Sequence, residues 1–413
     1  MIRYIIKRLL VSLTTLSLVA SLSGCGNLLQ TYLPSNTAPN EGEYVTDNAT
    51  QVVSPDELES HESVPENVTD DTASSQEGLF YYDHLSSDDK KIYIEIYYIL
   101  NSMMEEVTVS TLDEEQLSRV FECVINDHPE LFYVDGYSYV KYMVGQKPKE
   151  MTFSGTYNMT KDEANEHVKR INEYIDTFAE SLKNGVDNTD DYNIIKFVYE
   201  YIIRGTDYDK NVKFDQSIVS VMEEGRSVCS GYSKTAQLLL NSCGISTTVV
   251  LGRVKDGEAH SWNLVLADGK YYYMDVTWGD SSYTLREDSD EFSNSLPEVN
   301  YIYMLMPLSE IEDTHDFDHP EYMPECLSME DNYFVKEKLY FTAVDDQMLW
   351  QAFNNAYVNE KEYIMIRMDN PECYDNMRDH LLKDQKIFDY VLTRDGSVSY
   401  AENREQRYMV FWL

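Results

Sequence analysis

The chain has 413 residues, which is enough for two or three domains with hydrophobic cores of their own. It carries 33 Lys and Arg residues against 73 Asp and Glu residues, so its formal net charge is −40. This balance argues against nucleic acid as a partner, because binding to phosphates requires clustered basic side chains.

The first 25 residues have the pattern of an export signal. Arg3, Lys7 and Arg8 precede an uncharged, mostly apolar stretch at 9–22, which is shorter than the roughly 20 residues that a membrane-spanning helix needs. The segment ends in "LSGC", which resembles a bacterial lipobox and implies cleavage before Cys25 and lipid attachment to its sulfur. We therefore expect an extracytoplasmic protein, lipid-anchored to the cell membrane; a short uncleaved anchor is the alternative.

Residues 26–78 are expected to form a disordered acidic tether. From Thr31 to Gly78 there is no Lys or Arg, there are eleven Asp or Glu residues, and large apolar residues are few. Such a composition buries too little apolar surface to offset the entropy of ordering the chain. The tether would space the folded part of the protein away from the lipid surface.

Residues 79–155 are predicted to form a small α/β unit. Ser86 and Ser87 are suitable helix caps for the apolar repeat that follows them, and a second helix ends before Pro129. The segment "LFYVDGYSYVKYMVG" alternates in the manner of two strands, which we expect to be joined at Asp135–Gly136.

Residues 156–320 are predicted to form the central domain. Its first helix begins with the capping-box pair Thr160 and Glu163, and a second helix at 190–205 precedes the segment "TDYD". Another helix begins at Cys229, and the strands "TTVVLGRV", "HSWNLVLA" and "YYYMDVTW" follow it. Residues 331–413 are expected to form a C-terminal α+β unit in the order β-α-β-α-β-β.

Cys229 combines a nucleophilic side chain with the start of a helix. Apolar residues repeat at helical spacing after it, and Gly244 suits the residue that follows a helix. Unpaired N–H groups and the helix dipole favour an anion at this end, so they lower the pKa of a thiol there. The same N–H groups could stabilise a developing oxyanion.

His260 and Asp275 are predicted to lie on one face of a hairpin. The pair Asp268–Gly269 is a strong signal for a two-residue turn, which pairs Ala267 with Lys270. In that register Trp262 faces Asp275 and His260 faces Thr277, with all four side chains on one face. Diagonal neighbours in a hairpin lie about 7 Å apart, within reach of an imidazole–carboxylate contact. The three residues together suggest a Cys-His-Asp arrangement for acyl transfer.

The blocks "SVCSGYS", "CGISTTVVLG" and "HSWNLVLADGKYYYMDVTWGD", with the upstream "TDYD", resemble the bacterial transglutaminase-like superfamily over about residues 160–318. The resemblance implies an α+β fold with a papain-like core, in which the helix bearing the cysteine packs on an antiparallel sheet bearing His and Asp, flanked here by two small α/β units. It implies Cys229 as nucleophile, His260 as general acid and base, and Asp275 as the residue that orients the imidazole. The segment ending at His315 resembles the close of the family domain, so no chemistry is expected of His315.

Some positions depart from the family pattern. Animal-type transglutaminases have Gln before the cysteine and Trp after it, where this chain has Val228 and Ser230. Protein cross-linking is therefore not implied. Trp262 and Tyr208 are weak candidates for oxyanion or cleft residues. No C-x-x-C pair and no spacing typical of a calcium loop occurs, so we expect neither a metal nor another cofactor.

The sequence thus predicts an extracytoplasmic, lipid-anchored cysteine acyl-transfer enzyme that acts on peptide or protein amides. Hydrolysis is favoured over transamidation, because water is abundant and nothing marks a site for an amine. The expected substrate is a peptide or protein near the envelope, with cell-wall peptide as one example. The alternative is a non-catalytic envelope binding protein that uses the domain as a scaffold. Substrate identity, disulfide pairing and oligomeric state do not follow from the sequence.

Overall fold

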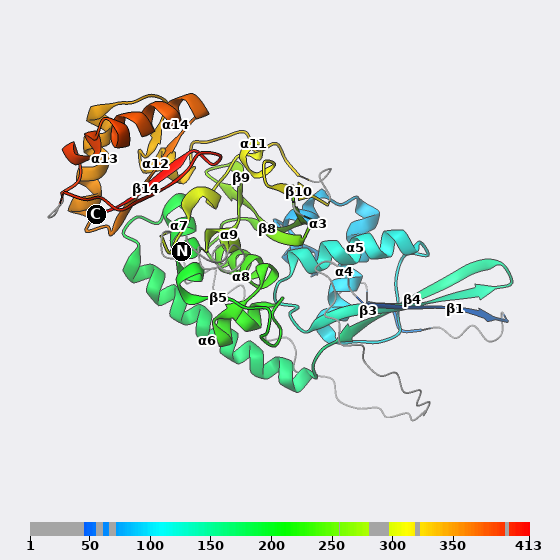
Figure 1. Cartoon of the computed structure of the whole chain (residues 1–413). Coiled ribbons are helices and arrows are strands. Elements are labelled where there is room, and N and C mark those ends of the chain that lie inside the picture. Colours follow the sequence, from blue (N-terminus) through cyan, green and yellow to red (C-terminus); the bar gives the residue numbers. More distant parts are fainter. Residues whose placement is uncertain are drawn as a thin grey trace.

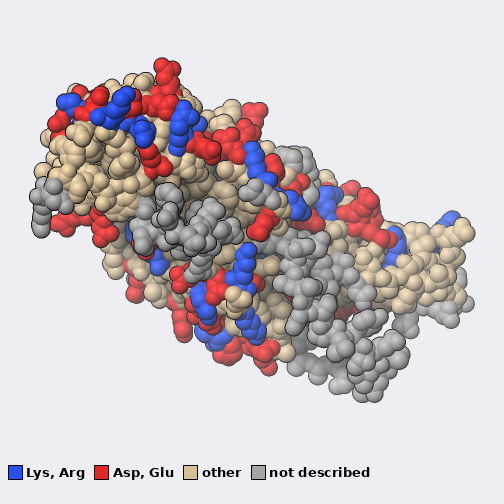
Figure 2. Space-filling model, in the orientation of Figure 1, with Lys and Arg blue, Asp and Glu red and all other residues tan. Residues whose placement is uncertain are grey.

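A computed structural model describes residues 45–54, 61–65, 72–255, 257–280, 297–318, 323–392 and 396–413. The predicted signal segment and Cys25 lie outside these residues. The molecule is elongated, with the C-terminal unit at one end, the central domain in the middle and a long hairpin of the N-terminal unit at the other end (Figure 1). On the face drawn in Figure 2, acidic side chains gather mainly along the upper edge and the lower left, with basic side chains among them.

The N-terminal unit packs helices on a four-stranded sheet of order β1-β3-β4-β2. The predicted cap of helix α4 is confirmed, because the Ser86 side chain accepts a hydrogen bond from the N–H of Asp89. The helices are α3 (Phe80–His84), α4 (Ser87–Ser102) and α5 (Glu114–Asp127), and the strands are β1 (Val45–Val53), β2 (Val107–Thr108), β3 (Val134–Val144) and β4 (Lys147–Tyr157).

The prediction of a disordered tether is wrong for part of 26–78. Residues 45–53 form β1, which pairs in parallel with β3 over its whole length. Ser63 bridges to Thr108, and His61 lies 3.1 Å from a carboxylate oxygen of Glu150. Most residues of β1 whose burial is described are exposed, so backbone pairing rather than side-chain burial holds this edge strand. The amino-acid composition of 45–53 did not predict this strand, because composition indicates side-chain burial and not backbone pairing.

The turn predicted at Asp135–Gly136 is also wrong. Strand β3 runs through both residues, and its pairing with β4 shifts register between Val134 and Gly136. The hairpin turns instead at Gly145, whose φ of 64° suits glycine. The Asp–Gly pair therefore marks an irregularity within a strand, which is a common alternative to a turn for glycine in a strand pattern.

The central domain packs helices on an antiparallel sheet of order β10-β7-β8-β9. The capping box at Thr160 and Glu163 is present as predicted. The α-helices are α6 (Lys161–Gly185), α7 (Asp191–Gly205), α8 (Cys229–Ser242), α9 (Val276–Gly279) and α11 (Leu308–Ile311), with a π-helical turn η1 (Ser220–Glu224) and a 3-10 turn η2 (Tyr301–Tyr303). The strands are β5 (Asp207–Tyr208), β6 (Arg226–Ser227), β7 (Thr247–Val254), β8 (Ala259–Ala267), β9 (Lys270–Met274) and β10 (His315–Phe317).

The predicted register of the β8–β9 hairpin is confirmed. Ala267 pairs with Lys270, and Asp268 and Gly269 have φ of 47° and 77°, as a primed two-residue turn requires. Strand β9 ends at Met274, however, and Asp275 becomes the N-cap of α9. Thr277 therefore lies in a helix and does not pair with His260, contrary to the extended register.

The C-terminal unit has a sheet of order β11-β12-β14-β13, and its predicted order β-α-β-α-β-β is confirmed apart from one short helix that precedes it. Hydrophobic residues of all three parts form one continuous core. Within the described residues, no helix combines the length and hydropathy needed to cross a membrane. The elements of the C-terminal unit are α12 (Tyr333–Lys336), β11 (Tyr340–Phe341), α13 (Asp346–Val358), β12 (Tyr363–Met368), α14 (Pro371–Arg378), η4 (Asp379–Lys383), η5 (Lys386–Asp389), β13 (Tyr400–Asn403) and β14 (Tyr408–Trp412).

Candidate active site

Cys229 is the first residue of α8, and its side chain is buried, with 2% of the residue exposed. The N-cap residue is Val228, which offers no side-chain hydrogen bond to the first turn. The positive end of the helix dipole is therefore not neutralised by a capping side chain at the cysteine. A thiolate or a developing oxyanion is the kind of group that this helix end stabilises.

The loop before α8 is held by backbone pairing and by a close glycine contact. Strand β5 pairs in parallel with β6, with Tyr208 opposite Ser227, so the "TDYD" segment lies beside the loop that leads to the cysteine. A Cβ atom on Gly231 would lie 1.8 Å from the Ser227 hydroxyl oxygen, which explains glycine two residues after the cysteine. The Ser227 hydroxyl donates to the carbonyl of Asp215.

Helix α8 packs directly on the strand that bears His260. The hydroxyl oxygens of Ser233 and Ser261 are 3.1 Å apart, and the Asn263 amide donates to the carbonyl of Ser233 at 2.9 Å. Ser233 lies one turn after Cys229, and Ser261 follows His260 in the chain. The cysteine end of α8 is therefore adjacent to the His260 end of β8.

The structure brings His260 and Asp275 together, as the hairpin register predicts. The Nε2 atom of His260 lies 2.8 Å from Oδ2 of Asp275, and both residues are buried, with 4% and 0% exposed. The other carboxylate oxygen accepts the N–H of Trp278 at 3.1 Å, and the Asp275 N–H donates to Tyr303. Because Nε2 of His260 contacts the carboxylate, a proton exchanged with a thiol would go to or from Nδ1.

His315, of which no chemistry was expected, also contacts Asp275. Its Nε2 atom lies 3.2 Å from Oδ2 of Asp275, and only 1% of the residue is exposed. The ring centroids of His260 and His315 are 5.3 Å apart. His315 reaches this position because β10 pairs with β7, where His315 lies opposite Val254. No local sequence pattern specifies that pairing.

Two imidazoles keep the buried carboxylate ionised. Burial raises the pKa of Asp275, but the charge and hydrogen bond of His260 and the hydrogen bond of His315 outweigh it, so the pKa is lowered overall. Burial also lowers the pKa of His315, and its contact with Asp275 offsets this only in part. We infer a neutral His315 ring at pH 7 that donates its Nε2–H to the carboxylate.

Aromatic rings cover the two imidazoles. The ring centroids of Trp262 and Trp278 each lie 4.8 Å from the ring centroid of His315. The distances from the same two rings to the His260 ring are 6.1 Å for Trp262 and 5.9 Å for Trp278. A Cβ on Gly252 would approach Trp262 to 2.6 Å and the Asp316 carbonyl to 2.1 Å, so glycine is needed where β7 meets β10.

The two candidate oxyanion or cleft residues lie near the site, and their roles stay predictions. Trp262 is fully buried, and its indole N–H has no partner among the described residues. Tyr208 is mostly buried, and its ring centroid lies 6.5 Å from that of Tyr232 on α8. Each has a clear packing role in the structure.

Among the described residues, one group of side chains has the types and the spacing needed to hold a metal ion. It consists of His260, Asp275 and His315. Both imidazoles already point a nitrogen at the same carboxylate oxygen, as hydrogen-bonded partners do. The two hydrogen bonds account for the grouping without an ion.

The other four cysteines of the described chain are unsuited to nucleophilic chemistry. Burial raises the pKa of Cys123 to about 12 and those of Cys243, Cys326 and Cys373 to about 11. No disulfide joins any of the five described cysteines. Cys229 differs from these four in being the first residue of a helix whose N-terminal end packs on the strand that bears His260.

A family model described as the transglutaminase-like superfamily matches residues 176–276, which include Cys229, His260 and Asp275. The chain is similar to a crystal structure of a TGase, with 15% identity, a TM-score of 0.26, and coverage of 38% of this chain and 53% of that one. It is also similar to a candidate cysteine protease from Cytophaga hutchinsonii, with 11% identity, a TM-score of 0.23, and coverage of 33% and 55%.

A third similar structure is the periplasmic domain of TgpA from Pseudomonas aeruginosa bound to ethylmercury, with 12% identity, a TM-score of 0.20, and coverage of 32% and 58%. The chain thus spans little more than half the length of these three structures. None of the curated proteins compared with the chain gives a significant match.

Proposed function

We propose that this chain, whose residues 176–276 match the transglutaminase-like superfamily model, is a cysteine acyl-transfer enzyme that acts on peptide or protein amides. The observation that carries the proposal is the buried hydrogen bond between His260 and Asp275, next to the helix start that bears Cys229. A general base held by a carboxylate beside a nucleophile is the arrangement that covalent acyl transfer needs.

In the first half of the proposed reaction, Nδ1 of His260 accepts the proton of the Cys229 thiol. The thiolate attacks the carbonyl carbon of the amide, and N–H groups at the start of α8 stabilise the negative charge that develops on the oxygen. The C–N bond then breaks, and the protonated imidazole gives its proton to the departing amine. A thioester between Cys229 and the acyl group remains.

In the second half, water attacks the thioester. His260 takes a proton from that water, the C–S bond breaks, and the proton returns to the sulfur, so that a carboxylic acid leaves and the thiol is restored. An amine in place of water would give transamidation. We favour hydrolysis, because water is abundant and Val228 and Ser230 stand where cross-linking relatives have other residues.

Asp275 and His315 act in this scheme by positioning. Asp275 holds His260 in the tautomer with hydrogen on Nε2 and stabilises the imidazolium that forms. His315, through its own hydrogen bond to the same oxygen, fixes the carboxylate and keeps it ionised. His315 is thus a positioning residue one step removed from the reacting atoms.

We also propose that the mature chain is a lipoprotein outside the cytoplasmic membrane, anchored through Cys25, with a peptide or protein of the envelope, such as cell-wall peptide, as substrate. The motif "LSGC" after the basic and apolar segments supports this. Cys25→Ala should prevent lipid labelling and release the protein from the membrane fraction. Unchanged lipid labelling of that variant would contradict the anchor.

Labelling with a thiol-reactive peptide mimic, such as a peptidyl epoxide, tests the proposed chemistry. The mature protein should be labelled once, at Cys229, and Cys229→Ala should lose the label. Cys373→Ala is the matched control, since Cys373 is equally buried and its pKa is raised by burial. Equal labelling of both variants would contradict the proposal.

A further inference from the structure

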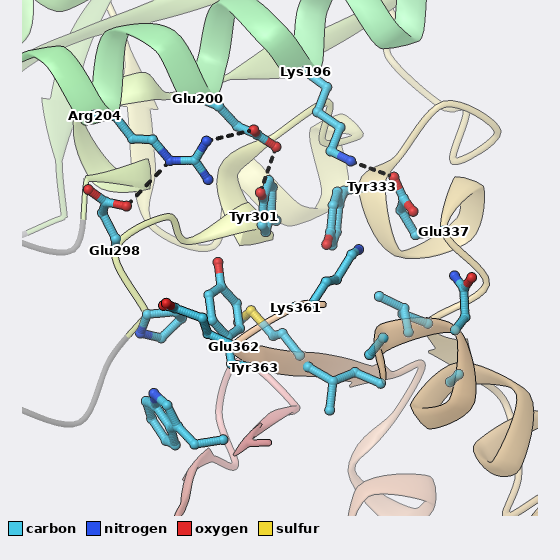
Figure 3. Close-up of a pocket in the computed structure, with 18 residues that line it drawn as sticks. Lys196, Glu200, Arg204, Glu298, Tyr301, Tyr333, Glu337, Lys361, Glu362 and Tyr363 are labelled. Carbon is cyan, nitrogen blue, oxygen red and sulfur yellow. Dashed lines mark hydrogen bonds and ion pairs between the residues drawn. The ribbon is translucent and has the colours of Figure 1, made fainter. Parts of the chain in front are cut away.

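A pocket of about 540 Å³ lies between α7 of the central domain and the C-terminal unit, and none of the proposed reacting residues lines it (Figure 3). Its volume is within the range of sites for small organic ligands. Helix α7 forms one wall, and residues at the end of α13 and the start of β12 face it.

The charged residues of the α7 wall are all paired. Lys196 contacts Glu337 at 2.8 Å, and Arg204 contacts Glu200 at 3.2 Å. Arg204 also reaches Glu298 at 3.3 Å. Because these side chains are already paired with one another, they form a fixed rim of the pocket, consisting of Lys196, Glu200, Arg204, Glu298 and Glu337. Their charges do not require a ligand as counter-ion.

Lys361 and Tyr333 differ from that rim. The Lys361 side chain is partly buried and points into the pocket, and its ammonium group has no hydrogen bond or ion pair with any described residue (Figure 3). Tyr333 is only 4% exposed, yet its hydroxyl also lacks a partner within the described chain and points toward the same space. Its ring is fixed by stacking on Tyr301, with centroids 3.8 Å apart and planes at 3°.

An unpaired ammonium and a hydroxyl donor, both aimed into one cavity, are suited to a single anionic group. Burial lowers the pKa of Lys361, as expected for a cation without a close counter-ion. The lining holds three cations (Lys196, Arg204, Lys361) and four carboxylates (Glu200, Glu298, Glu337, Glu362), a net charge of −1. That excess of negative charge disfavours a polyanion and favours a ligand that also carries a positive group.

We propose that this pocket binds a small zwitterion, an amino acid or a short peptide, whose carboxylate pairs with Lys361 and Tyr333. The positive amino group would then face the carboxylates of the lining, of which Glu362, the exposed residue that follows Lys361 in the chain, is the one without a partner among the described residues. The aromatic and aliphatic residues of the lining would contact the side chain of the ligand. This site is separate from the proposed catalytic chemistry and does not depend on it.

The test is isothermal titration of the mature protein carrying Cys229→Ala, so that no probe is consumed. The probes are free amino acids and glycyl dipeptides with each standard side chain, and the same compounds as C-terminal amides. At least one free acid should bind, and its amide should bind about tenfold more weakly or worse, because a charge-assisted hydrogen bond is lost. Failure of every free acid to bind, or equal binding of acid and amide, would overturn the proposal.

Variants locate the site. Lys361→Met keeps the aliphatic stem and should weaken binding by about tenfold or more, while Tyr333→Phe keeps the stacked ring and should weaken it by a smaller factor. Lys149→Met, at an exposed lysine on β4, is the matched control and should bind as the parent does. Thermal unfolding would verify that both pocket variants are folded. Unchanged affinity of both variants for the ligand would then show that it binds elsewhere. If the wild-type protein had no acyl-transfer activity, the assignment of Cys229 would be contradicted, but the binding measurements on the pocket would still stand.

Discussion

Two aspartates of this protein are buried to the same degree and near histidines, yet their surroundings differ. Asp127 ends α5, and its carboxylate accepts hydrogen bonds from the N–H groups of Tyr81 and Tyr82 and from the Tyr93 hydroxyl, at 2.9 to 3.1 Å. Asp275 accepts hydrogen bonds from two imidazoles instead. The exposed fractions are 3% and 0%.

The pKa values of the two carboxyls move in opposite directions. Burial raises the pKa of Asp127 to about 6, and His128 and the neutral donors lower it only in part. His128 itself points Nδ1 at Glu130, at 2.6 Å. Burial also raises the pKa of Asp275, but the direct imidazole contacts reverse the sign. Burial alone therefore does not mark a functional carboxylate, whereas an imidazole bonded to it and adjacent to a nucleophile does.

The largest expected effect comes from Asp275→Asn. The amide group would favour the wrong tautomer of His260, so the turnover rate should fall by a factor on the order of 10⁴. The measurement is hydrolysis of a peptide amide or, before a substrate is found, the rate of labelling of Cys229. Activity within tenfold of the parent would place Asp275 in the same structural class as Asp127.

Removal of the second imidazole should have a smaller effect. His315→Leu leaves Asp275 with one imidazole donor, so the turnover rate should fall about tenfold, the loss of one charge-assisted hydrogen bond. The pKa of Asp275 should rise, because its ionised form loses a donor, and the acid limb of the pH–rate profile should move to higher pH. His315→Gln keeps an N–H donor and should restore most of both. An unchanged acid limb in His315→Leu would show that His315 serves packing alone.

Asp127→Asn should have the smallest effect on activity, less than about threefold, and its effect should be on stability. One acceptor oxygen is lost from a buried site with three donors, so the free energy of unfolding should fall by about 1 to 3 kcal/mol. Chemical denaturation and a turnover assay measured on the same sample separate the two effects. A large loss of turnover with normal stability would contradict the comparison.

The pH dependence of stability sharpens the same contrast. The pKa of Asp127 is about 6 in the folded protein and near 3.8 in the unfolded chain, so the folded state binds more protons between these values. The contribution of this group to stability is therefore greatest below about pH 4 and is lost as the pH rises through about 6. Asp127→Asn should remove that slope, and an identical slope in the variant would show that another group titrates.

Much of the site follows from the sequence because its elements are local. The capping box at Thr160 and Glu163, the helix that begins at Cys229 and the turn at Asp268–Gly269 depend on residues a few positions apart. Parity along the hairpin then placed His260 and Asp275 on one face. The same extrapolation failed at Thr277, because Asp275 caps a helix and ends the strand.

The features that the sequence did not predict depend on contacts between distant segments. His315 reaches Asp275 through pairing of β10 with β7, which requires the space left by Gly252. Strand β1 pairs with residues about ninety positions away and lies at an exposed edge, so neither its composition nor its spacing marks it. The pocket at Lys361 and Tyr333 exists only where the central domain meets the C-terminal unit.

The most direct test of the central claim is the rate of iodoacetamide reaction at each cysteine of the mature protein, followed by mass spectrometry at pH 6. Cys229 should react at least about tenfold faster than Cys123, Cys243, Cys326 and Cys373, because only its thiol is activated, and His260→Ala should abolish the difference. A rate at Cys229 that is no faster than the others, or that is unaffected by His260→Ala, would contradict the assignment of Cys229 and His260 as nucleophile and base.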